Sequence, residues 1–373
     1  MNETKEFSVH MALLAIFFSS FCIHDIKAIT VNNEEHFPYS TRTIAKTTSG
    51  DIYDCIDRQS QTGFKVPTLH KPNVSFKNES KGFDLDEIWS GKPCPPGTIP
   101  VPQKTGKLQK YTFPPKSFLR DGESYSGGTE FVGIIVNEGE LMGAYAEITI
   151  WNPKPIHPGQ FSAASILVEN GEDAIEAGWI VHPDLYQDTQ TRLYTAWRTA
   201  TGGYYNVDYP GFVIVNEEIP LNYVFPRTSN AWGEIDQVAI TIQRGDEAGN
   251  WYLTVNGNVL GFWKGELFSK LANSAATIRF GGQVYSRPPT KDSPPMGSGR
   301  FVNNNHIRTC YMQNVQILMD EFVPPPSYTK IDLTRCYACG GDNYVDQPKR
   351  GVKGFHFYIG GKGGHDGTSC VYV

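Results

Sequence analysis

The absence of several common catalytic motifs excludes several kinds of reaction for this sequence. It contains no HExxH zinc motif, no Walker phosphate-binding loop and no GxSxG nucleophile elbow. The glycine-flanked serine at 296–299 (MGSG) has the wrong spacing for such an elbow and predicts a tight turn. No two histidines of the C-terminal body have metal-ligand spacing; they are His157, His182, His306, His356 and His365, each expected on the surface or in a loop. We therefore expect no metal and no cofactor, which leaves carboxylate chemistry.

Glu176 is the carboxylate whose context favours chemistry most. It stands just before Gly178 and Trp179, where a strand is expected to begin. Partial desolvation there would raise its pKa and suit it to general acid or base work in acidic media. From the pattern alone, a surface glutamate at the start of a strand is the commoner structure.

The elements that must position such a group are predicted to be short strands. Alternating apolar and polar residues indicate strands at 146–151, 162–169, 178–181, 238–242, 251–255, 258–263, 276–280 and 315–319. Asn256-Gly257, between two of them, is typical of a type I′ hairpin turn. One short helix is expected at 266–271. Many short strands separated by turn residues predict an all-β fold, an antiparallel, jelly-roll-like β-sandwich.

The N-terminus resembles an export signal. The apolar run at 11–23 is too short to span a membrane comfortably, and cleavage is expected after Ala28. An N-terminal anchor or a buried apolar segment is the alternative. We predict a signal peptide at 1–28, a small front segment at 29–118 and the sandwich domain at 119–373, with no membrane span after signal removal.

Charge is divided unevenly along the chain. Residues 29–120 carry a net +4, from 13 Lys and Arg against 9 Asp and Glu, whereas residues 121–373 carry −9, from 18 against 27. A basic front segment and an acidic body could dock through complementary surfaces; unrelated drift of two surfaces is the alternative. The basic residues do not cluster, so no nucleic-acid partner is expected.

Cysteines and sequons also suit an exported chain. Once Cys22 leaves with the signal, six remain: Cys55, Cys94, Cys310, Cys336, Cys339 and Cys370. An even number in such a chain favours disulfides, but six cysteines permit fifteen pairings. The sequons at Asn73 and Asn78 predict an exposed, glycosylated stretch.

A series of motifs in fixed order resembles one family. The motifs are YDCID at 53–57, CPPGTIP at 94–100, EAGWIVHP at 176–183, TRLYTAW at 191–197, TG…YN…PGFV at 201–213, ELF at 266–268, FGG at 280–282, MGSG at 296–299 and CY…YIGG…C at 336–370. Together they resemble the neprosin-type plant glutamic peptidases, in which an activation peptide precedes the catalytic domain. The resemblance covers most of the chain after the signal.

The resemblance implies a zymogen that cleaves after proline in acid, using two glutamates across a cleft. The first maps to Glu176, but the second position, directly after FGG, is Gln283. An amide cannot titrate, yet it can orient water and donate a hydrogen bond to a developing oxyanion. The eqolisin-type glutamic peptidases are similar in principle, since they use one Glu and one Gln. Loss of one of two acid/base groups commonly costs about 10²–10⁴-fold in rate.

Partners and disulfides follow from the same resemblance. The implied partners are a proline-containing peptide or protein substrate and the chain's own pro-segment, at residues 29–118. The implied location is secreted or vacuolar, in the apoplast or a digestive fluid. We expect the disulfides Cys55–Cys94, Cys336–Cys370 and Cys310–Cys339. The TG…PGFV block lacks the cysteine pair of the family, with Gly203 and Tyr209 in the corresponding stretch.

Two hypotheses of function remain open from sequence. One is an acid-acting secreted endopeptidase that works with Glu176 and Gln283. The other is a catalytically weakened sandwich that binds a proline-rich cell-wall protein, a peptide or a glycan. Four tryptophans could line its groove: Trp179, Trp197, Trp232 and Trp263. In the first hypothesis, Trp179 and Trp197 are candidates for the substrate cleft. Core packing is the alternative for all four.

Overall fold

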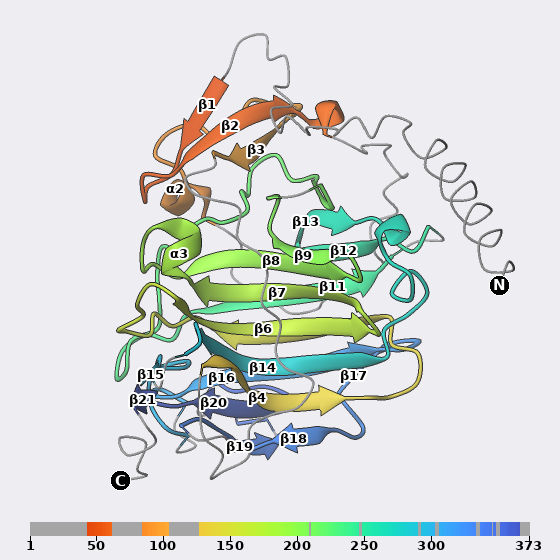
Figure 1. Ribbon diagram of the computed structural model, residues 1–373. Coiled ribbons are helices and arrows are strands. Elements are labelled where there is room, and N and C mark those ends of the chain that lie inside the picture. The colour runs from red at the N-terminus through yellow and green to blue at the C-terminus, as the bar shows by residue number, and fades with distance from the viewer. Residues whose placement is uncertain are drawn as a thin grey trace, which may run out of the picture. The chain divides into compact units, whose positions relative to one another are not determined.

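Antiparallel strands dominate the computed structural model, which describes residues 43–61, 84–103, 127–208, 210–245, 248–289, 292–302, 306–332, 336–344, 346–347 and 351–365. Two large sheets face each other, and this confirms the predicted antiparallel β-sandwich (Figure 1). The expected signal peptide and the sequons at Asn73 and Asn78 lie outside the described residues. In the part of the chain that the structure describes, no helix is long and apolar enough to cross a membrane.

The seven-stranded sheet, here called the site sheet, carries both Glu176 and Gln283. Across the sheet its strands are β18 (Thr329–Ile331), β4 (Gly128–Val136), β14 (Thr277–Ser286), β6 (Gln160–Asn170), β7 (Asp173–Val181), β8 (Arg192–Thr199) and β9 (Gly202–Tyr205). Every neighbouring pair is antiparallel. The short helix α3 (Pro183–Tyr186) follows β7.

The second large sheet has nine strands. In order they are β10 (Phe212–Ile214), β13 (Asn258–Trp263), β12 (Trp251–Val255), β11 (Gln237–Arg244), β5 (Gly143–Thr149), β16 (Cys310–Leu318), β20 (His356–Gly360) and β19 (Ala338–Asn343), with β17 (Phe322–Val323) beside β16. A separate pair joins β15 (Asp292–Ser293) to β21 (Gly364–His365). The predicted hairpin of β12 and β13 is confirmed, and Asn256 and Gly257 have φ angles of 46° and 79° in its turn.

The helix expected at 266–271 is wrong. The structure has only a 3-10 turn, η2 (Gly265–Leu267). The backbone N–H groups of Ser269, Lys270 and Leu271 instead donate to the buried carboxylate of Asp173, at 2.7, 2.6 and 3.2 Å. These amides are therefore satisfied by a side chain of the site sheet and cannot serve a continuing helix.

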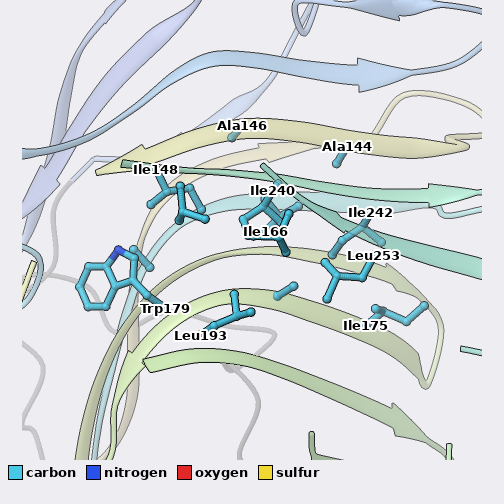
Figure 2. Close-up of a cluster of buried hydrophobic side chains, with 14 of the residues drawn as sticks. Ala144, Ala146, Ile148, Ile166, Ile175, Trp179, Leu193, Ile240, Ile242 and Leu253 are labelled. Atoms are coloured by element: carbon cyan, nitrogen blue, oxygen red, sulfur yellow. The ribbon is translucent and has the colours of Figure 1, made fainter. Parts of the chain in front are cut away.

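The core lies between the two large sheets (Figure 2). Ile166 and Leu193 of the site sheet pack in one cluster with Ile148 and Ile240 of the second sheet, and all four side chains are fully buried. Trp179 joins this cluster and donates its indole N–H to the Thr149 carbonyl oxygen, at 2.9 Å. Burial of each large apolar side chain contributes about 1.5–3 kcal/mol. One face of the site sheet is thus committed to the core, and the other is left for the site.

A small front sheet precedes the sandwich. It consists of β1 (Thr43–Lys46), β2 (Ile52–Asp57) and β3 (Thr98–Pro102), with the one-turn helices η1 (Arg58–Ser60) and α2 (Leu85–Ile88) beside them in sequence. The disulfide Cys55–Cys94 ties β2 to the segment before β3, as predicted. The Tyr53 hydroxyl donates to the Leu221 carbonyl oxygen at 2.8 Å.

Ion pairs between the front segment and the body run in both directions. Arg192 of β8 holds Asp51 with two hydrogen bonds of 2.9 and 3.0 Å, and Arg227 pairs with Glu87 at 3.0 Å. In the reverse sense, Arg58 pairs with Glu217 at 3.4 Å. In the first two pairs the positive charge belongs to the body and the negative charge to the front segment, which is the reverse of the net charges of the two segments. Individual ion pairs of both senses therefore act at this contact.

Two of the expected disulfide cysteines are unpaired thiols. Cys310 and Cys339 are both buried and free, so the expected bond between them is absent. Cys310 of β16 and Cys339 of β19 both register with Ile359 of β20, one from each side. Two strand spacings separate their backbones by roughly 9.5 Å, beyond the ~7 Å limit for a disulfide. Cys336 is disulfide-bonded, while its expected partner Cys370 lies outside the described residues.

Candidate active site

Glu176 lies in the middle of β7, not at a strand start as expected. The strand begins at Asp173, and the Glu176 side chain is completely buried. Strand alternation directs Ile175 and Ala177 into the core and Glu176 to the opposite face. The carboxylate therefore lies on the face of the site sheet that the core leaves free.

Three donors meet one oxygen of this carboxylate. Glu176 Oε1 accepts from the Tyr194 hydroxyl at 2.6 Å, from the Ser165 hydroxyl and from the side-chain amide of Gln283. Glu176 Oε2 is buried and has no hydrogen-bond partner among the residues that the structure describes, and the same holds for Gln283 Oε1. The two predicted residues are therefore brought together, and each keeps one acceptor unused.

Burial controls the ionisation of this cluster. It raises the pKa of Glu176 from 4.5 to about 8, while the hydrogen bond from Tyr194 and the positive charge of Arg279 lower it. Burial, with the neighbouring Glu176, also raises the pKa of Tyr194 well above its usual value. Arg279 is held by Glu169 at 2.6 Å. Below about pH 8 the closed site thus contains a protonated carboxyl group and a tyrosine that remains a donor.

The tryptophans expected near the cleft lie elsewhere. Trp179 and Trp197 both belong to the core cluster, on the opposite face of the sheet from Glu176, and they are 0% and 3% exposed. Trp263 is also in the core, whereas Trp232 is 66% exposed and stacks on Arg308 at 4.3 Å. Odd spacing from Glu176 explains the error for Trp179, since residues three apart on a strand point to opposite faces.

Aromatic side chains occupy the site's face instead. Phe161, Tyr194 and Tyr205 form a buried cluster there with three aliphatic residues, which are Ala163, Ile180 and Ala196. The cluster also borders His182, whose ring centroid is 5.3 Å from that of Phe161. His182 lies in the connection between β7 and α3, and so in a loop as the expectation of a surface or loop histidine allows, but it is buried, and burial lowers its pKa to about 4.

Residues 158–362, more than half of the chain, match the neprosin family. The chain belongs to the neprosin family. Among solved structures, it resembles scytalido-glutamic peptidase with a transition state analog inhibitor, at 10% identity and a TM-score of 0.36, over 62% of this chain and 98% of that one. SCP-B, a member of the eqolisin family in complex with the tripeptide Ala-Ile-His, gives 8% identity and a TM-score of 0.32 over the same shares.

Glycines of two neprosin motifs clear the space in which Glu176 and Gln283 meet. Ser165 of β6 registers with Gly178 of β7 on one side and with Gly281 of β14 on the other. A Cβ atom at Gly178 would lie 2.1 Å from the Ala164 carbonyl oxygen, and one at Gly281 would lie 2.3 Å from that of Val132. No side chain stands on either side of Ser165, so Glu176 and Gln283 reach each other diagonally above it.

Two members of this neprosin-family site were missed from sequence. Ser165 and Tyr194 donate to Glu176, yet neither stands in a motif that suggests catalysis. Strand alternation could have identified Tyr194: its neighbour Leu193 is in the core, and Tyr194 itself registers with Gly178, two residues from Glu176, and so shares the face of Glu176. Across the described ranges, no group of three or more His, Cys, Asp or Glu residues could hold a metal ion.

Proposed function

We propose that this neprosin-family protein is a secreted, acid-acting endopeptidase zymogen that cleaves after proline. The observation that supports the proposal is the buried hydrogen bond between Glu176 and Gln283, with one unused acceptor on each side chain. One unused acceptor on each side chain suits the two hydrogens of one attacking water. The family supplies the expectation of peptide hydrolysis and of proline specificity.

In the proposed reaction, Glu176 is both general base and general acid. Its Oε2 takes a proton from water as the water oxygen bonds to the peptide carbonyl carbon, and Gln283 Oε1 holds the second water hydrogen. One Gln283 N–H is bound to Glu176, whereas the other meets Tyr194 loosely, at 3.3 Å. That second N–H suits the developing oxyanion. As the C–N bond breaks, Glu176 returns its proton to the leaving amine.

The closed site must open before a substrate can bind. Glu176 and Gln283 are 0% and 1% exposed, and burial is the largest influence that keeps Glu176 protonated. Once the site is opened to solvent, only the two influences that lower the Glu176 pKa persist. We infer that opening turns Glu176 from a protonated acid into a base that functions in mildly acidic solution.

The front segment is our candidate for the element that keeps the zymogen closed. Its Asp51 is held by Arg192, which lies two residues from Tyr194 on the same face of β8. Glu87 of the front segment is likewise held by an arginine of the body, Arg227. Carboxylates in general lose their charge in acid, so we propose that acid weakens this docking.

Hydrolysis of a proline-containing peptide between pH 3 and 7 tests the proposal. The wild type should cleave after acid treatment, and Glu176→Gln should lose about 10²–10⁴-fold. Glu147→Gln is the matched control, since Glu147 is a buried glutamate that accepts from Gln313 at 2.7 Å in the second sheet. Absence of cleavage by the wild type, or equal cleavage by Glu176→Gln, would overturn the proposal.

A binding protein without hydrolytic activity is the second candidate. The replacement of a family glutamate by Gln283 favours it. The structure does not support a binding groove lined by tryptophans, since Trp179, Trp197 and Trp263 lie in the core. If the wild type binds proline-rich peptides without cleaving them and Gln283→Glu cleaves, this candidate replaces the first.

A further inference from the structure

The hydroxyl of Tyr194 contacts both members of the Glu176–Gln283 pair. It donates to Glu176 Oε1 at 2.6 Å and accepts from Gln283 Nε2 at 3.3 Å. Tyr194 is fully buried, on β8, whereas Gln283 lies on β14, with β7 and β6 between the two strands. The side chains of Tyr194 and Gln283 thus extend toward each other from strands that are three spacings apart.

Glycine makes this reach possible. Tyr194 registers with Gly178 on β7, and Gly178 registers with Ser165 on β6. No side chain at position 178 stands between the tyrosine ring and the pair. The neprosin AGW motif therefore contributes Gly178 to the space that Tyr194 crosses.

Hydrogen-bond directions then fix the orientation of the Gln283 amide. A phenol has one hydrogen, and Tyr194 gives it to Glu176, so its oxygen can only accept from Gln283. Because Nε2 must face Tyr194 and Glu176, Oε1 of Gln283 is turned to the other side. The donors of Ser165 and Tyr194 likewise occupy Oε1 of Glu176 and leave Oε2 for proton exchange.

We propose that Tyr194 is a positioning residue that selects the working atoms of the pair, Glu176 Oε2 and Gln283 Oε1. The inference rests on the proposed function. The effect of Tyr194 can nevertheless be tested independently of catalysis, because the tyrosine acts on the ionisation of Glu176 and on the orientation of the Gln283 amide whether or not a substrate is turned over. Burial keeps the Tyr194 pKa well above its usual value, so the donor persists through the acid range.

Tyr194→Phe tests the proposal, with Tyr252→Phe, a buried tyrosine of the second sheet, as the matched control. For Tyr194→Phe we expect kcat to fall by about 10²-fold, as for loss of one preorganised donor, with KM nearly unchanged. The Glu176 carboxyl, followed by ¹³C NMR of labelled glutamate, should titrate at higher pH, because the Tyr194 hydrogen bond lowers its pKa. Tyr252→Phe should change neither quantity.

A second variant covers poor folding of the first. Incorporation of 3-fluorotyrosine at position 194 gives a more acidic phenol and a stronger donor, so Glu176 should titrate at lower pH. An unchanged Glu176 titration in both variants would overturn the role of Tyr194. A wild type that never cleaves would instead overturn the proposed function, and the titration would still decide the positioning role.

Discussion

Gln283 donates its side-chain amide to Glu176 across an intervening strand, β6, which is hydrogen-bonded to the strands of both residues. Glutamine has the shape of a protonated glutamate but cannot lose its proton. The pair therefore resembles a two-carboxylate site in which one carboxyl group is permanently protonated and only the other, Glu176, titrates. In a true pair of carboxyls, both groups titrate, and the pair holds a single proton only over a limited pH range.

Gln283→Glu should add an ionisation to the pH–rate profile. Two carboxyl groups within hydrogen-bond distance share one proton, so the variant would work only where that proton is retained. We expect its activity to decline toward neutral pH earlier than that of the wild type. Initial rates with one peptide from pH 3 to 8 measure this difference. Superimposable profiles would show that position 283 does not take part in the ionisation of the pair.

Glu176→Gln should flatten the pH dependence of stability. The folded-state pKa of Glu176 is raised from 4.5 to about 8, so between these pH values the unfolded chain ionises this group and the folded chain does not. Glu176 thus costs no stability below about pH 4.5 and progressively destabilises the fold up to pH 8. Each pKa unit corresponds to about 1.4 kcal/mol.

Urea unfolding at pH 4.5, 6 and 8 checks this prediction. The wild type should lose several kcal/mol more than Glu176→Gln over that range. Glu147→Gln provides the comparison for loss of a buried glutamate outside the site. Parallel curves for the wild type and Glu176→Gln would refute the raised pKa.

Gly178→Ala should disrupt the site and the sheet together. The new Cβ would lie 2.1 Å from the Ala164 carbonyl oxygen and 2.7 Å from the Ser165 Cα, both backbone atoms of β6. The two strands must separate locally, at a cost of about 1–3 kcal/mol. Gly340→Ala is the control, because its Cβ would meet only Val302 Cγ1 at 3.4 Å. The midpoint temperature of thermal unfolding and the activity per folded molecule should both fall for Gly178→Ala, and neither should fall for Gly340→Ala.

Asp51→Asn should loosen the front sheet. Asp51 makes two hydrogen bonds to Arg192, whose side chain is only 5% exposed, and asparagine keeps one acceptor. We expect docking to weaken by about 1.5–3 kcal/mol, as for loss of a hydrogen bond to a charged group. Amide hydrogen exchange in β1–β3 measures the loosening. Glu217→Gln, which alters the more exposed pair with Arg58, should change exchange by less than about 0.5 kcal/mol, and equal effects would contradict the prediction.

Local patterns predicted the fold where a local rule decides the structure. The β12–β13 hairpin follows from Asn256-Gly257 because few other residues adopt the positive φ angles of its turn. The strand expected to end at Phe280 instead continues to Ser286. Gly281 and Gly282 follow the expected end of this strand, yet they lie within it, and Gly281 serves the close approach of neighbouring strands. Glycine has both uses, and only the partner strands distinguish them.

The candidate pair itself came from a family motif, since no local pattern joins positions 176 and 283. Sheet order and register bring the two residues together, and both depend on contacts distant in sequence. The same limit explains the errors for Trp179 and for the Cys310–Cys339 pair. The face of a strand and the neighbour of a cysteine are set by the assembled sheets.

The two thiols that flank Ile359 have a practical consequence. Neither Cys310, at 0% exposure, nor Cys339, at 4%, meets solvent in the folded chain, and β20 holds them apart. They cannot oxidise to each other while the second sheet is intact, and an alkylating reagent reaches them only after that sheet opens. The rate of thiol labelling therefore reports how often the second sheet of the sandwich opens, and it can be measured without any substrate.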